Sequence, residues 1–380
     1  MTLATSCCAR WATDCFRLSE VQIPLHDWGG DEFIVLLTEI SEVDEVGLVC
    51  SQILNRLAEP HRIDGREIIL TASLGVSLFP QDSDNGPCLI RNADMAMYRA
   101  KRGKGNDFAY YSPEMDRRAA ETLELEGALR NALERAQFCL FYQPQIDLVS
   151  GQIICCEALV RWHHPLRGMV APGDFIPLAE ETGLIVPLGS WVLQEACRQA
   201  RQWQEQGARG VRVAVNISGR QFADPGFVGK VRETLQESGL EPNLLELEIT
   251  ESVAMERVET TIQTWMDLEA LGVSLSVDDF GTGYSSLSYL KQFPIHSLKI
   301  DRSFVRDITR NPNDAVIASS VIALAHSMGL KVVGEGIETR EQLKFLEEKK
   351  CDMGQGFLFS RPVPFDEILQ LFKASTKHSI

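Results

Sequence analysis

The sequence predicts an α/β fold whose C-terminal part is a (β/α)₈ barrel of the TIM type. Two observations predict it. From residue 138 onward, apolar runs of β type alternate with amphipathic helical runs, as expected for a barrel built from repeated βα units. Acidic, amide and basic residues recur where these apolar runs end. In a TIM-type barrel the active site lies at the ends of the strands.

The composition is that of an ordinary globular protein. The chain has 380 residues, of which 44% are hydrophobic and 24% are charged. Its net charge of −16 argues against binding to duplex DNA or RNA, which needs clustered Lys and Arg. No apolar run is long enough to span a bilayer and the N-terminus lacks a signal-peptide pattern. We therefore expect no transmembrane segment and a cytoplasmic location.

Any metal site in this chain is expected to use oxygen ligands. The ten cysteines include no C-x-x-C pair, and the seven histidines include no H-E-x-x-H pattern. Without a secretory signal, we expect the thiols to be reduced.

Residues 1–112 are expected to form a partial α+β domain. Gly29-Gly30, ahead of Asp31 and Glu32, indicates a tight turn, because glycine accepts a positive φ. The spacing of the apolar residues and the residue types then predict strands at residues 33–37 and 68–79 and helices at residues 41–58 and 87–102.

Residues 113–137 are expected to form a connecting helix. Leu125, Leu129 and Leu133 recur at i, i+4 and make an apolar stripe in an otherwise polar segment. Two interpretations remain open: a first helix that packs on the next domain, or a signalling helix that relays the state of the upstream domain.

Residues 138–380 are expected to form the barrel. The clearest helix covers residues 313–328, with Gly329 as its stop. The eight strands are predicted at residues 138–146, 153–161, 211–217, 244–250, 273–277, 297–300, 331–334 and 352–359.

Seven of these strands carry or end in a polar residue, which indicates a divalent-metal site. The residues are Glu157, Asn216, Glu248, Asp278 with Asp279, Lys299, Glu335 and Gln355. Any one of these residues alone could be a solvated polar residue at a strand end. If the acidic ones are buried together, however, they would repel one another strongly. Carboxylate and amide oxygens suit Mg²⁺ or Mn²⁺. Two ions about 3.5–4 Å apart could share Asp278, which we expect at the tip of the fifth strand, and activate a water.

Motifs in the first domain resemble the second half of a GGDEF domain, a family that makes cyclic di-GMP from GTP. The resembling segments are Gly29 to Phe33, Ser73 to Val76 and Ala93 to Lys101, within residues 28–112. Too few residues precede Gly29 to supply the family's first strand and its metal-binding acid. We therefore expect no cyclase activity and interpret Asp31 and Glu32 as turn residues.

The barrel motifs resemble those of the EAL-domain cyclic di-GMP phosphodiesterases, over about residues 141–362. The motifs are Glu157-Ala158-Leu159, Asn216-Ile217-Ser218, Glu248 to Ser252, Asp278 to Gly283, Lys299-Ile300-Asp301, Glu335 to Glu338 and Gln355-Gly356. The resemblance implies hydrolysis of cyclic di-GMP to linear pGpG with two Mg²⁺ or Mn²⁺ ions. It also implies a barrel whose first strand is antiparallel, and a homodimer formed through the barrel.

The same resemblance implies roles for individual residues. The first metal would be held by Glu157, Asn216, Glu248 and Asp278. The second metal and the water would be served by Asp278, Asp279 and Glu335, with Lys299 beside them. Substrate contacts would come from Gln143, Arg161, Asp301 and Gln355. Glu251 would brace the loop that follows Asp279.

Two alternatives to a phosphodiesterase remain. A catalytically silent receptor would bind cyclic di-GMP and signal through residues 113–137, and the incomplete first domain motivates that idea. A bifunctional enzyme would also synthesise the dinucleotide, but the missing first half of the GGDEF-like domain disfavours it.

Overall fold

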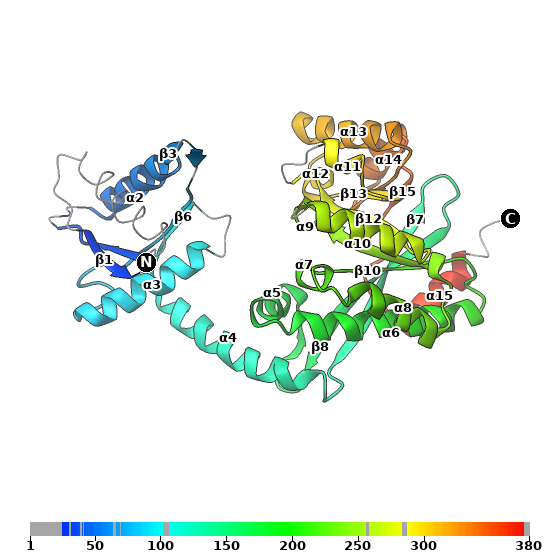
Figure 1. Cartoon of the computed structure of the whole chain (residues 1–380), viewed down its shortest axis with the longest axis horizontal. Helices are drawn as coiled ribbons and strands as arrows, with labels where there is room; N and C mark the ends of the chain where they lie inside the picture. Colours follow the sequence, from blue (N-terminus) through cyan, green and yellow to red (C-terminus); the bar gives the residue numbers. More distant parts are fainter. Residues whose placement is uncertain are drawn as a thin grey trace. The chain divides into compact units, whose positions relative to one another are not determined.

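The chain separates into two compact units, one ending at Leu123 and the other beginning at Glu124 (Figure 1). The computed structural model describes residues 25–29, 32–38, 40, 42–63, 66–68, 70–101, 106–255, 258–282 and 287–375. The boundary between the units falls within helix α4 (Pro113–Ala132), which covers much of the segment predicted as a connecting helix. Among the described residues, no helix is long and apolar enough to cross a membrane.

The described residues of the first unit form three small two-stranded sheets and two helices ahead of α4. Antiparallel pairs join β1 (Leu25–Gly29) to β2 (Glu32–Val35) and β3 (His61–Ile63) to β4 (Arg66–Ile68), and β5 (Ser73–Val76) runs parallel to β6 (Asp107–Tyr110). The helices are α2 (Val43–Leu57) and α3 (Gly86–Lys101).

Close packing between a strand and a helix in this unit explains why residue 75 is a glycine. A Cβ on Gly75 would lie 1.8 Å from the carbonyl oxygen of Ala93, so only glycine lets β5 lie against α3. The strand expected at residues 68–79 is in fact the end of β4 followed by the separate β5. Asp31 lies outside the described residues.

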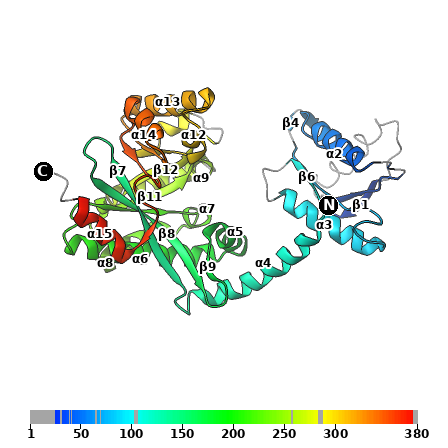
Figure 2. The ribbon, with the colours of Figure 1, turned by 180° about the vertical axis from the view of Figure 1, so that it is seen from behind.

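The second unit is a closed barrel of eight strands, which confirms the predicted fold class (Figures 1 and 2). Strand β7 is antiparallel to both of its barrel neighbours, β8 and β15, whereas the other neighbouring pairs are parallel. The strands in barrel order are β7 (Phe138–Asp147), β8 (Ile153–His164), β10 (Arg212–Asn216), β11 (Leu245–Thr250), β12 (Ser274–Phe280), β13 (Ser297–Ile300), β14 (Lys331–Gly334) and β15 (Met353–Gly354).

Further elements extend and cover the barrel. Strand β9 (Gly168–Val170) pairs with β8, and β16 (Val363–Pro364) pairs with β7. The helices are α5 (Pro172–Thr182), α6 (Ile185–Glu205), α7 (Gly219–Phe222), α8 (Phe227–Ser238), η1 (Pro242–Leu244), α9 (Glu251–Met255), α10 (Val258–Ala270), α11 (Leu287–Leu290), α12 (Arg302–Arg306), α13 (Pro312–Ser327), α14 (Arg340–Glu348) and α15 (Phe365–Ser375). Helix α6 buries the apolar stripe Leu188, Val192, Ala196, Ala200 and Trp203, spaced three or four residues apart, in the core.

The eighth and fifth strands differ from their predicted bounds in ways that affect the site. The eighth was expected at residues 352–359, but β15 contains only Met353 and Gly354. A Cβ on Gly356 would lie 2.1 Å from the carbonyl oxygen of Ile337, so the chain turns there into close backbone contact instead of continuing as a strand.

The fifth strand is longer than predicted, because β12 runs to Phe280. Asp278 and Asp279 therefore lie inside the strand and not past its tip. The pairing with β13 shifts between Val277 and Phe280, and Asp279 has a φ of 54°, which together form a bulge. A bulge re-aims adjacent side chains that a regular strand would point to opposite faces.

Candidate active site

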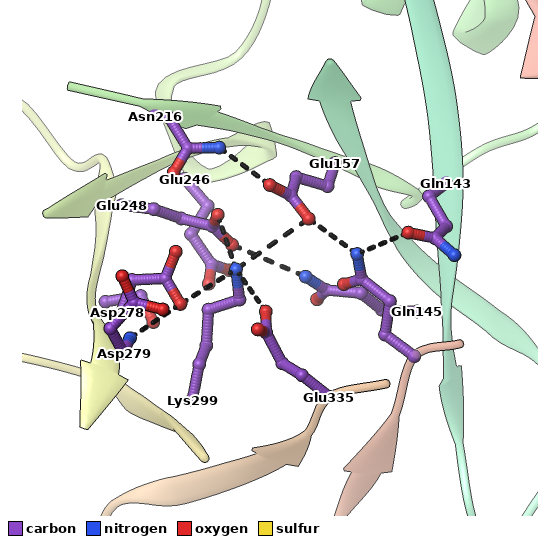
Figure 3. A network of polar contacts seen from close by, with 12 residues as sticks. Gln143, Gln145, Glu157, Asn216, Glu246, Glu248, Asp278, Asp279, Lys299 and Glu335 are labelled. Carbon is purple, nitrogen blue, oxygen red and sulfur yellow. Dashed lines mark hydrogen bonds and ion pairs between the residues drawn. The ribbon is translucent and has the colours of Figure 1, made fainter. Parts of the chain in front are cut away.

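The ammonium group of Lys299 is the centre of a buried ionic network (Figure 3). Lys299 is in β13 and its side chain is fully buried. Its Nζ lies 2.7 Å from Glu248 Oε2, 2.7 Å from Glu335 Oε1, 3.3 Å from Asp278 Oδ1 and 3.8 Å from Glu157 Oε2. Burial alone would lower the pKa of Lys299, but these carboxylates outweigh it and raise the pKa well above its ordinary value. The surrounding carboxylates therefore favour the charged form of Lys299.

One cation does not balance the acids around it. Burial and the neighbouring Asp278 raise the pKa of Glu335 to about 8 despite the opposing effect of Lys299. Burial, Asp278 and Asp301 raise the pKa of Asp279 to about 6. Burial also raises the pKa of Glu248 well above its ordinary value. Without a further cation, the carboxyl groups resist full ionisation.

The donor set fits a divalent metal. Asp278, Asp279 and Glu335 each offer a carboxylate oxygen, and these oxygens lie within 4.8 Å of one another. The bulge of β12 lets two consecutive aspartates serve one place. Clustered carboxylates with excess negative charge suit Mg²⁺-like or Mn²⁺-like ions and not soft metals.

Amide side chains hold the opposite wall of the site. Asn216 Nδ2 donates to Glu157 Oε1 at 2.6 Å, which turns the amide oxygen of Asn216 away from Glu157. Gln355 Nε2 donates to Glu157 Oε2 at 2.5 Å and to Gln143 Oε1 at 3.1 Å. Gln143 Nε2 in turn donates to the carbonyl oxygen of Ser360 at 3.0 Å. The orientation of Glu157 is thus set by two amides.

The structure brings most of the sequence-predicted residues into this network. Those joined by direct contacts or by the carboxylate cluster are Gln143, Glu157, Asn216, Glu248, Asp278, Asp279, Lys299, Glu335 and Gln355.

The other three predicted residues lie around the network. Glu251 Oε2 accepts from the backbone N–H of Gly281 at 2.7 Å, directly after the bulge. Asp301 begins α12 as its N-cap, accepting from the backbone N–H of Ser303 at 3.0 Å. The Arg161 guanidinium lies 5.5 Å from the centre of the Phe141 ring. Residues 283–286 of the loop after Gly281 lie outside the described part.

Two buried polar residues of the barrel interior were not predicted. Gln145 Nε2 donates to Glu248 Oε1 at 3.4 Å. Glu246 lies 3.2 Å from Arg212 and accepts from Ser297 Oγ at 3.2 Å. Each is two residues away from a predicted site residue on the same strand, so the period of two that governs strand faces was the available signal.

Comparisons with known proteins match both parts of the chain. Residues 126–362 match the family described as "EAL domain", and residues 17–107 match "Diguanylate cyclase, GGDEF domain".

Curated relatives carry both kinds of name. The bifunctional diguanylate cyclase/cyclic di-GMP phosphodiesterase MucR of Pseudomonas aeruginosa is 45% identical over 341 residues, 90% of this chain and 50% of that protein. The cyclic di-GMP phosphodiesterase PdeR of Escherichia coli (strain K12) is 42% identical over 336 residues, 88% of this chain and 50% of that protein. This chain thus spans about half the length of these relatives.

Solved structures match the barrel. The PaMucR phosphodiesterase in complex with c-di-GMP has a TM-score of 0.63 and 48% identity, covering 64% of this chain and 99% of the solved one. The EAL enzyme Bd1971, bound to cAMP and cyclic di-GMP, has a TM-score of 0.64 and 38% identity, covering 67% of this chain and 69% of the solved one.

Proposed function

Because the chain belongs to the EAL domain family, we propose that it hydrolyses one phosphodiester bond of cyclic di-GMP, giving linear pGpG, with Mg²⁺ or Mn²⁺. The observation that carries this proposal is the buried ammonium of Lys299 surrounded by carboxylates from β8, β11 and β12 and from the residue that follows β14. Such a centre keeps an unbalanced negative charge that divalent cations neutralise. Relatives and solved neighbours named for cyclic di-GMP support the substrate.

The residues divide into two overlapping ligand sets. Glu157, Asn216, Glu248 and Asp278 would hold one ion. Asp278, Asp279 and Glu335 would hold the second and accept hydrogen bonds from the attacking water. When bound, the ions would supply positive charge to the phosphodiester. They would also lower the pKa of a water, so that its hydroxide form is available as the nucleophile.

The chain's other side chains would position these groups and the substrate. Lys299 holds Glu248 and Glu335 by its two short contacts, so it keeps a carboxylate of each proposed set in place. Arg161 would pair with a phosphate of the substrate, a charge-assisted contact for which its planar guanidinium is suited. Gln143, Asp301 and Gln355 would complete the substrate contacts.

The remaining expectations belong to the same proposal. The barrel would form a homodimer, residues 1–112 would be a GGDEF-like domain without cyclase activity, and residues 113–137 would connect it to a barrel domain of residues 138–380. The protein would act in the cytoplasm, where reduced thiols persist. Seven cysteines among the described residues are free, in keeping with that location.

The test is to incubate the full chain with cyclic di-GMP and Mg²⁺ or Mn²⁺ and to follow pGpG by chromatography. We expect pGpG with either ion, little with Ca²⁺, whose coordination is larger and looser, and none with a chelator. Tight binding of cyclic di-GMP without any pGpG would contradict the proposal and favour the receptor. Conversion of GTP to cyclic di-GMP in a parallel reaction would contradict the expected lack of cyclase activity.

A further inference from the structure

Gln145 lies among the site residues although it belongs to no proposed ligand set. It is fully buried in β7, two residues after Gln143, so both side chains lie on the same face of the strand. The antiparallel pairing of Ile146 with Gly354 places the next residue, Gln355, beside Gln145. Gln145 therefore belongs to the same layer of the barrel interior as the site amides.

We propose that Gln145 is a positioning residue for the carboxylate of Glu248. Its Nε2 donates to Glu248 Oε1 at 3.4 Å, while Lys299 Nζ lies 2.7 Å from Glu248 Oε2. Each oxygen of this buried carboxylate thus has its own donor. Together the two donors restrict rotation about the last side-chain bond of Glu248, which is otherwise broad and two-fold. The proposal rests on the proposed function, because only there is Glu248 a metal ligand.

The geometry of the same amide argues against a role in packing alone. Gln145 Oε1 is buried and has no hydrogen-bond partner within the described residues, and the same is true of Gln355 Oε1. A buried acceptor without a partner is costly, and an apolar side chain of similar length would avoid the cost. The other end of the amide does have a partner, because Nε2 donates to Glu248 Oε1 at 3.4 Å. The part of Gln145 that matters for the site is therefore its N–H group, which donates to Glu248.

The amide also cannot be turned around without loss. If its oxygen faced Glu248, two acceptors would oppose each other and Glu248 Oε1 would lose this donor. A side chain that donates there and carries no charge leaves the negative charge of Glu248 available to a cation. A second lysine at this position would instead neutralise it.

Gln199 supplies a matched control. In helix α6 its Nε2 donates to Glu195 Oε1 at 2.5 Å, and its Oε1 is likewise buried without a partner. The replacement Gln199→Met therefore removes the same kind of contact, a glutamine amide on a glutamate, from an outer helix. Gln145→Met removes it from the site and keeps a side chain of similar length.

The experiment measures Mn²⁺ binding to the full chain by calorimetry without substrate, and then kcat and KM for cyclic di-GMP. We expect Gln145→Met to weaken Mn²⁺ binding by about 10-fold to 100-fold, as loss of a partner behind a metal ligand does. We expect kcat to fall while KM for the dinucleotide stays within about twofold, because uniform substrate binding is untouched. Gln199→Met should change none of these quantities.

Wild-type Mn²⁺ affinity in folded Gln145→Met, with only a lower melting temperature, would overturn the proposal. If circular dichroism shows that this variant does not fold, Gln145→Asn decides the matter. The shorter amide no longer reaches Glu248, so its Mn²⁺ affinity must fall, and an unchanged affinity overturns the proposal equally. Because metal binding is measured without substrate, a chain that binds Mn²⁺ but forms no pGpG would refute the proposed function and leave this test intact.

Discussion

Lys299 brings one positive charge into a cluster of five carboxyl groups, so the metal-free site is electrostatically unfavourable. This repulsion contributes to the raised pKa values of Glu335, about 8, and Asp279, about 6. Each of these acids holds a proton more tightly in the folded protein than in water. Divalent ions would relieve the repulsion by replacing protons, which links metal binding, protonation and stability.

The metal-free protein should lose stability as the pH rises from about 5 to about 8.5. A carboxyl group whose pKa is raised by folding favours the folded state fully below its unfolded pKa of about 4.3. That contribution is lost as the pH rises through the folded pKa, which for Glu335 is about 8. Thermal unfolding in a chelator at several pH values measures the effect.

The variant Glu335→Gln is the control for this pH dependence. It cannot ionise, so its melting temperature should fall less over the same pH range than that of the wild type, and added Mg²⁺ should stabilise it less. Identical slopes for the two proteins would show that Glu335 does not cause the pH dependence.

Strand β12 determines how the two aspartates share one place. Its bulge between Val277 and Phe280 puts Asp279 in the left-handed region, at a φ of 54°. The strand is fixed just beyond the bulge, where Glu251 at the start of α9 accepts from the N–H of Gly281. This hydrogen bond joins α9 to the chain directly after β12, next to a proposed ligand.

Replacement Glu251→Ala should therefore disturb the site more than the fold. Loss of the acceptor leaves the Gly281 N–H without this partner, and we expect a loss of about 1–3 kcal/mol in unfolding free energy. Mn²⁺ affinity should fall by about 10-fold or more, because the strand that carries the ligands is released. Glu251→Gln keeps an acceptor oxygen and should retain most of that affinity. Equal effects of both variants would show that the charge matters and the brace does not.

Elements with strong local patterns were predictable from the sequence. The alternation of strands and helices predicted the barrel, and helix α13 (Pro312–Ser327) lies close to the expected 313–328, ending just before Gly329, which has a φ of 76°. The antiparallel first strand was implied by the family resemblance and is confirmed by the pairing of β7 with β8 and β15.

Elements that depend on distant contacts were not predictable. The bulge at Asp279 and the early end of β15 are set by neighbouring strands and by the backbone of Ile337, which no local pattern reveals. Most candidate site residues could be predicted because acidic, amide and basic residues recur at the ends of the predicted strands. Gln145 was missed because it lies inside strand β7, where only its spacing of two residues from Gln143 indicated that it faces the site.

The whole molecule consists of two units that each have a hydrophobic core. The second unit contains one continuous core that runs from Leu125 to Phe372, and the first has a small one around Val46, Cys50 and Val76. The proposed catalytic residues all belong to the second unit. The solved PaMucR phosphodiesterase, 99% of which is covered, matches 64% of this chain.

A fragment of residues 124–380 should therefore retain hydrolysis. All proposed metal ligands and Lys299 belong to this fragment, so we expect kcat within about tenfold of the full chain and a similar dependence on Mg²⁺. The comparison is made at matched concentrations of folded protein. A fragment that folds and binds Mn²⁺ but forms no pGpG would show that the first unit is required for catalysis.

The most direct test of the account is the rate of pGpG formation by Asp278→Asn with saturating Mg²⁺. Asp278 belongs to both proposed ligand sets and contacts Lys299, and asparagine keeps its shape while removing its charge. We predict a fall in kcat of more than about 100-fold, beyond the usual cost of losing an outer partner of a metal ligand, with Asp314→Asn on helix α13 as an active control. Wild-type turnover by folded Asp278→Asn would contradict the two-metal account.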